Sequence, residues 1–70
     1  MAEKVKINRL KVVLAERDMS QKDFAKLLAT NVNTISRICK NEQQPTLYTL
    51  RNMALALDVD IRELLVPTKE

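Results

Sequence analysis

Residues 20–45, SQKDFAKLLATNVNTISRICKNEQQP, predict two short helices joined by a tight turn. Apolar side chains recur at helical spacing in both halves of this segment. They are Phe24, Ala25 and Leu28 in the first half and Ile35 and Ile38 in the second. A helix that is buried along Ile35 and Ile38 turns its other side to solvent. The segment therefore predicts which side chains of the second helix lie on the surface.

Small polar, amide and basic side chains occupy the outward side of this second helix, about 32–40. They are Val32, Asn33, Thr34, Ser36, Arg37 and Lys40. Arginine is the commonest bidentate partner of guanine, asparagine pairs with adenine, and an apolar side chain can pack on a thymine methyl group. Hydroxyl groups and lysine reach phosphates as well as bases. The pattern predicts a helix that lies in the major groove of double-stranded DNA, and hence a DNA-binding regulator.

Polar residues on either side of the second helix are candidates for contacts with the DNA backbone. Gln21 opens the first helix, where the positive helix end favours a phosphate. Asn31 is a plausible N-cap of the second helix, and Asn41, Gln43 and Gln44 follow its end. Each assignment has a plainer alternative. Gln21 and Arg37 can be solvated surface side chains, and Val32 and Asn33 can serve packing and capping.

Composition excludes most enzymes and most cofactor sites. The 70 residues suffice for one domain, 1–70, with a core over about 6–66 and no deep pocket. The sequence has no glycine, which nucleotide-binding loops need, and no histidine. Its single cysteine, Cys39, cannot form a disulfide within the chain, and we expect a small buried hydrophobe there rather than a redox sensor. We expect no catalytic residue, no metal and no cofactor.

Charge is distributed unevenly along the chain. Residues 1–17 hold five basic and two acidic side chains, whereas residues 58–70 hold two basic and four acidic ones. One basic end suits a molecule that turns one face toward phosphate. The sequence has no apolar run long enough to span a membrane and no signal-peptide pattern at its start, so we expect a cytoplasmic protein.

Hydrophobic periodicity predicts an all-α chain of five helices. The first covers about 5–17, with Ile7, Leu10 and Leu14 on one face. Ser20, Asn31 and Thr46 are the expected N-caps of the next three helices, and Asp60 that of a short fifth helix that Pro67 ends. The core stripe of the fourth helix is expected to be Leu47, Leu50, Met53, Ala54 and Leu57. We expect residues 68–70 to form a frayed tail.

The chain resembles the phage-repressor/Cro-type (XRE) helix-turn-helix family over about residues 6–66. The matching positions are Leu10, Leu14, Arg17, Ser20, Gln21, Phe24, Ala25, Thr34, Ile35, Ser36, Pro45, Leu47, Leu50, Met53, Ala54, Ala56, Leu57 and Val59. The resemblance implies a compact five-helix, lambda-repressor-like domain that binds double-stranded DNA sequence-specifically and regulates transcription. Two family glycines are replaced by Ala29 and Asn41. Asparagine tolerates a left-handed backbone fairly well, whereas alanine adopts it at a cost of roughly 1 kcal/mol or more.

Two alternatives to a transcriptional regulator remain open from the sequence. An antitoxin or restriction-modification controller would use the same fold, and a helical protein-interaction module would not bind DNA. Such a module would need an apolar or acidic outer face over residues 32–40, where the sequence has a polar and basic one. The resemblance further implies a homodimer on a palindromic operator. We expect it to pair through Val59, Leu65 and Val66, although these side chains can instead complete the core of a monomer.

Overall fold

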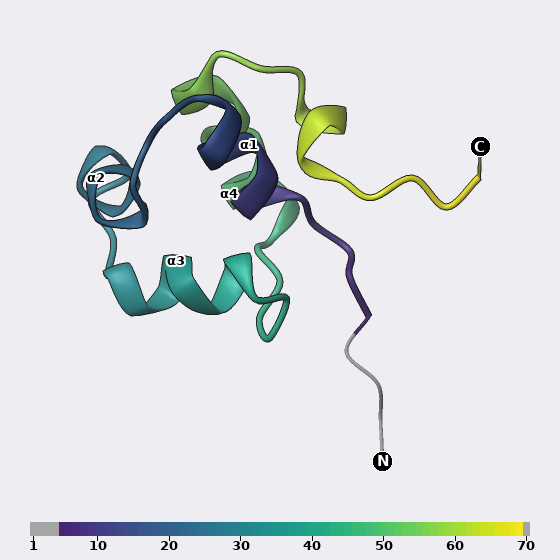
Figure 1. Ribbon diagram of the computed structural model, residues 1–70, viewed down its shortest axis with the longest axis horizontal. Helices are drawn as coiled ribbons and strands as arrows, with labels where there is room; N and C mark the ends of the chain where they lie inside the picture. Colours follow the sequence, from purple (N-terminus) through teal and green to yellow (C-terminus); the bar gives the residue numbers. More distant parts are fainter. Residues whose placement is uncertain (1–4, 70) are drawn as a thin grey trace.

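The computed structural model describes residues 5–69, which form an all-helical domain (Figure 1). Lys4 of the basic N-terminal region and Glu70 of the expected tail lie outside the described residues. The helices are α1 (Leu10–Glu16), α2 (Gln21–Leu27), α3 (Val32–Cys39), α4 (Leu47–Leu57) and the short 3-10 helix η1 (Ile61–Leu64). No helix within residues 5–69 combines the length and the apolar character that a membrane span requires.

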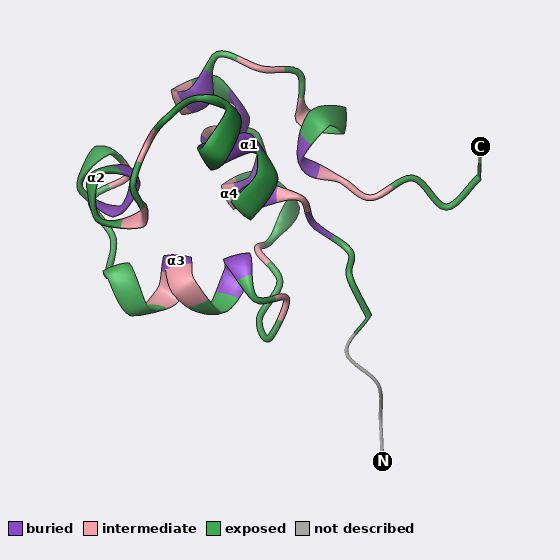
Figure 2. Ribbon diagram, in the orientation of Figure 1, coloured by how far each residue is buried: buried purple, intermediate pink, exposed green. Residues whose placement is uncertain are grey.

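The helices surround a single hydrophobic core, whose buried positions line the inner sides of the ribbon in Figure 2. All four α-helices contribute to it, and η1 adds one side chain. The buried residues are Leu10, Val13, Leu14, Phe24, Ala25, Ile35, Ile38, Cys39, Leu50, Met53, Ala54, Leu57 and Leu64. The helical periods read from the sequence therefore predict most of the core.

Two side chains that were expected in the core lie on the surface instead. Leu47 is 81% exposed because it is the first residue of α4 and lies at the edge of the core, beside Ile7 and Pro45. Ile7 is 48% exposed and precedes the first helix. Both residues fit the helical period. The period shows which face of a helix is apolar, but not which residues of that face lie beyond the edge of the core.

The first helix begins at Leu10, so the expected start near residue 5 is wrong. Residues 5–9, the N-terminal segment, are not helical. Asn8 forms an antiparallel bridge with Leu65, and the N–H of Arg9 donates to the carbonyl of Leu64 over 2.8 Å. The side-chain oxygen of Asn8 accepts from the N–H of Leu10 over 3.1 Å. Backbone groups that pair with distant residues in this way cannot also form the hydrogen bonds of a helix. The helix α1 therefore starts after them.

The last helical segment is a 3-10 helix of four residues, so the described chain contains four α-helices rather than the expected five. Asp60 caps it as expected, because its carboxylate accepts from the N–H of Arg62 over 2.8 Å. Leu65 immediately after it is extended and pairs with Asn8. Only four residues lie between this cap and that bridge, which leaves room for one tight turn but not for an α-helix.

Each α-helix ends through a residue in the left-handed conformation. These residues are Asp18, Ala29, Asn41 and Asp58, with φ of 54°, 55°, 59° and 55°. After α2, for example, the N–H of Ala29 donates to Lys26 and the N–H of Thr30 donates to Ala25. The same pair of bonds closes the other three helices. This is the Schellman motif, in which glycine is the usual left-handed residue, and the chain has no glycine.

Replacement of Ala29 by glycine should stabilise the domain by about 0.5–1 kcal/mol. Glycine removes the clash between the alanine Cβ and its own backbone, and this gain outweighs the greater freedom of the unfolded chain. Ala15→Gly is a matched control, since Ala15 is an exposed residue inside α1, and it should destabilise by about 0.5–1 kcal/mol. Urea unfolding measures both changes. A destabilised Ala29→Gly variant would contradict a strained turn.

Candidate nucleic-acid interface

The helices α2 and α3 and the turn between them form the helix-turn-helix unit expected from the sequence. Both helices begin with a side-chain cap. The Ser20 hydroxyl oxygen accepts from the N–H of Asp23 over 3.0 Å, and the side-chain carbonyl oxygen of Asn31 accepts from the N–H of Asn33 over 2.7 Å. These caps satisfy N–H groups that a helix start leaves without partners and fix where each helix begins. The left-handed Ala29 reverses the chain between them.

The two sides of α3 differ sharply in burial and chemistry. Ile35, Ile38 and Cys39 are buried against the body of the domain, on the side of the ribbon coloured purple in Figure 2. The exposed side chains on the other side are Val32, Asn33, Arg37 and Lys40. Thr34 and Ser36 are half-buried. The expected orientation of the helix is therefore confirmed, whereas DNA contact by these side chains remains a prediction.

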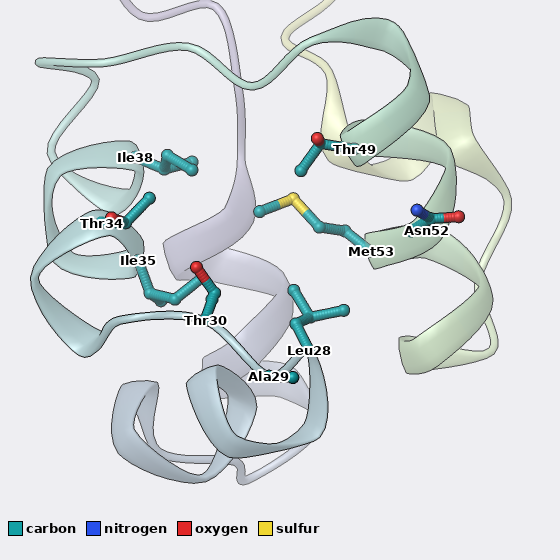
Figure 3. A pocket seen from close by; sticks show the side chains of 9 residues that line it. All are labelled: Leu28, Ala29, Thr30, Thr34, Ile35, Ile38, Thr49, Asn52 and Met53. Carbon is teal, nitrogen blue, oxygen red and sulfur yellow. The ribbon is translucent and has the colours of Figure 1, made fainter.

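A groove of about 270 Å³ separates α3 from α4 next to the turn (Figure 3). Leu28, Ile35, Ile38 and Met53 provide its apolar lining, and no charged side chain of the described residues lines it. Thr34 lies at the edge of this groove. Its hydroxyl group is therefore at the border of the outward face of α3, rather than at its centre.

The ion pairs among residues 5–69 leave out the basic side chains of this surface. Arg37 and Lys40 form no ion pair with any residue of the described range 5–69, and α3 itself contains no acidic residue. Gln21 is half-buried in the first turn of α2, and Gln43 is exposed in the loop after α3. The surface thus presents free cationic and amide groups, which are the donors that phosphates and base edges accept from.

Asn41 directs its side chain toward the protein rather than away from it. Its carbonyl oxygen accepts from the N–H groups of Ile7 and Asn8 over 2.9 and 3.0 Å and from the amide of Gln44 over 3.1 Å. Its own amide donates to the carbonyl oxygen of Asn8 over 3.2 Å. Asn41 was expected to contact DNA. The structure places its carbonyl oxygen in a set of internal bonds and leaves one amide hydrogen without a bond to residues 5–69.

Asn8 completes this set, and its role was missed in the sequence. It is the only buried polar or charged residue in the described chain, with 5% of its surface exposed. Its amide donates to the carbonyl of Ile38 over 2.9 Å and to the Gln44 side chain over 2.8 Å. We call Asn8, Asn41 and Gln44 the amide network. No local signal singles out Asn8, because its partners Ile38 and Gln44 lie 30 and 36 positions later in the sequence.

The amide network fixes the C-terminal end of α3. The carbonyl of Ile38, in the last turn of the helix, already accepts from the N–H of Asn41 over 3.0 Å. Asn8 supplies a second donor to it from the N-terminal segment, 30 positions away in sequence. The amide network therefore connects the end of α3 to the N-terminal segment.

Cys39 is buried at the end of α3, as expected for a small hydrophobe. Burial raises the pKa of its thiol, and the nearby Lys11 ammonium group lowers the pKa in part. A thiol with a raised pKa stays protonated near neutral pH and is a poor nucleophile. This agrees with a packing role rather than a reactive one.

Comparison with known proteins agrees with this geometry. Residues 9–70 match the family model of the Cro/C1-type helix-turn-helix DNA-binding domain. The fold is similar to the crystal structure of a candidate DNA-binding protein from Bacteroides fragilis, with a TM-score of 0.84 and 43% sequence identity. That similarity covers 86% of this chain and 97% of the other. No curated protein sequence matches the chain.

Replacement of Asn41 by glycine should destabilise the domain by about 1–3 kcal/mol, even though glycine suits the left-handed backbone. The loss of the amide leaves the partly buried N–H of Asn8 without its acceptor, and an unmade bond of this kind costs more than the relaxed backbone gains. Asn41→Ala should be less stable still, because it also keeps the strain. Urea unfolding of the two variants separates these effects. A glycine variant as stable as wild type would show that the Asn41 side chain contributes no more than the relaxed backbone gains.

Proposed function

Since the chain belongs to the Cro/C1-type helix-turn-helix DNA-binding family, we propose that it is a sequence-specific regulator of transcription that places α3 in the major groove. One observation carries the proposal. α3 is buried through Ile35 and Ile38, while its exposed side offers amide and basic side chains without ion-pair partners among residues 5–69. Because a regulator of transcription must have access to DNA, we assign the protein to the cytoplasm.

Base reading is assigned to the first turns of α3 and to Arg37. Arg37 reads guanine through two parallel hydrogen bonds, and Asn33 reads adenine. Val32, which is 42% exposed, packs on a thymine methyl group. Thr34 and Ser36, which are half-buried, contact the base or the phosphate next to it. These assignments rest on the exposure of each side chain and its donor chemistry.

Backbone contacts are assigned to residues on both sides of α3. Gln21 holds a phosphate at the start of α2, and Lys40 and Gln43 hold phosphates after α3. The Asn31 amide donates to a neighbouring phosphate while its carbonyl oxygen keeps the helix cap. Asn41 contributes through its remaining amide hydrogen, although its main role is to hold the amide network.

Arg37→Ala should weaken binding to the preferred sequence by about 1–3 kcal/mol and relax the preference at one base pair, while the fold is kept. Selection from a random DNA pool, repeated with the variant, measures both effects. Lys40→Ala is the control, because loss of a phosphate contact weakens all sequences alike. A variant that selects the wild-type sequence with full preference would show that Arg37 does not read a base.

Pairing on a palindromic operator is the second part of the proposal. A single module buries only about 600–1,000 Å² on DNA, and members of DNA-binding families commonly bind as dimers to half-sites about one helical turn apart. The proposed pairing surface includes Leu65 and Val66, which are half-buried at the C-terminal end. Ile7 lines a hollow with both of them, and Leu47 lines another with Ile7 and Leu65. Val59, by contrast, packs partly buried against the core of its own protomer.

Sedimentation at high protein concentration should detect a weak homodimer, which Val66→Glu should abolish because a charge at the centre of an apolar contact is left without a partner. Leu55→Glu is a matched control, since Leu55 is an exposed side chain of α4 outside both of these hollows. It should leave the dimer intact. A wild-type protein that remains monomeric and binds single half-sites as tightly as palindromes would contradict the dimer.

A further inference from the structure

A hollow of about 310 Å³ lies beside the C-terminal end of α3. Three basic side chains line it, Lys6 and Arg9 from the N-terminal segment and Lys11 from α1. No acidic side chain of the described residues lines it. We call it the basic hollow. Cys39 and Asn41, which flank Lys40, also line it and join it to the end of α3.

The three cations of the basic hollow differ in their availability. Arg9 is engaged, since its guanidinium donates to the carbonyl of Glu63 over 3.1 Å and lies 4.0 Å from the carboxylate of the same residue. Lys6 and Lys11 are exposed and form no ion pair with residues 5–69. Two ammonium groups of the hollow are thus free to bind an anion.

The walls of the basic hollow strengthen its positive potential. Val12, Val66 and Pro67 form them, and these side chains are apolar. A recess lined by charges of one sign and by walls of low polarity concentrates the electric field more than a flat surface does. The hollow is therefore better suited to a phosphate group than the same lysines would be on an open surface.

The amide network holds the basic hollow at a fixed place relative to α3. The N–H groups of Ile7 and Asn8 donate to the Asn41 side chain, so that Lys6 is tied to the loop directly after α3. The N-terminal segment runs past this loop in Figure 1. Lys11 lies close enough to Cys39, the last residue of α3, for its charge to act on the thiol.

We propose that the basic hollow binds a phosphate of the DNA backbone through Lys6 and Lys11, on the side of α3 next to α1. This inference rests on the proposed function, because it assumes that α3 lies in the major groove. A helix in that groove has a phosphate strand on each side of it. Gln21 is assigned to one strand, and the basic hollow, adjoining Lys40, supplies contacts to the other.

Salt dependence of DNA binding tests this site. The wild type and a Lys6→Gln, Lys11→Gln double variant are titrated between 50 and 200 mM NaCl with the selected operator and with a scrambled duplex. Loss of two ionic contacts should reduce the slope of log affinity against log salt by about 1.8 for each bound protomer, which means an affinity loss about 12-fold smaller per protomer over this range. The reduction should be equal for both duplexes, because phosphates carry no sequence information.

Two control variants separate the site from general charge and folding effects. A Lys6→Arg, Lys11→Arg double variant keeps both charges and should keep the wild-type slope. Arg62→Gln removes one charge from η1, where Arg62 pairs with Asp60 over 3.1 Å, and should also leave the slope unchanged. Thermal melts check that each variant folds, which we expect because both lysines are exposed.

The outcomes distinguish the basic hollow from the proposed function. An unchanged slope in the glutamine double variant, with selective binding by the wild type, would overturn the hollow and leave the proposed function in place. A wild type that does not bind DNA would overturn both. Titration of DNA-free protein with inorganic phosphate, followed by NMR shifts of Lys6 and Lys11, provides the last arm. Saturable shifts together with an unchanged DNA slope would assign the hollow to a free anion and overturn its role on DNA.

Discussion

The reversal of the chain after each α-helix depends on a left-handed residue, and no glycine is available for it. Two of the four positions are aspartate, one is asparagine and one is alanine. Aspartate and asparagine adopt this conformation at a lower cost than other residues with a side chain, whereas alanine has no polar group to compensate. Because these turns set the directions of successive helices, the shared core forms only when all four are in place. The strain at Ala29 lies within the helix-turn-helix unit itself.

Asn41 shows how the chain uses a residue that must be left-handed. Glycine there would relax the backbone but would remove the side chain that accepts from the N-terminal segment. Through Asn8 the same bonds reach the carbonyl of Ile38 and hold the end of α3. The outward face of α3 is thus positioned from both ends, by the cap at Asn31 and by the amide network. Precise placement matters for a helix that reads bases, since hydrogen bonds to base edges tolerate little displacement.

Local signals made much of this structure predictable from the sequence. The caps Ser20, Asn31 and Thr46 each accept from the N–H group that a capping residue should satisfy, and the helical period placed Ile35 and Ile38 in the core. The start of α1 and the nature of η1 were not predictable in this way. Ile7 fits the helical period, but its N–H donates to Asn41, 34 positions later, and it lies outside the helix. Tertiary pairing of this kind decides between helix and extended segment, and no local pattern reports it. The chemistry of the candidate interface was read from the sequence, but the bonds that hold it were not.

The central claim is that the exposed side of α3 lies against base edges in the major groove. Intermolecular NOEs in a complex of the protein with a duplex carrying its selected sequence test this most directly. We expect NOEs from Asn33 and Arg37 to major-groove protons of the bases, with Lys40 close to the sugar-phosphate backbone. A complex in which these side chains show no NOE to the duplex, while another face of the domain does, would contradict it.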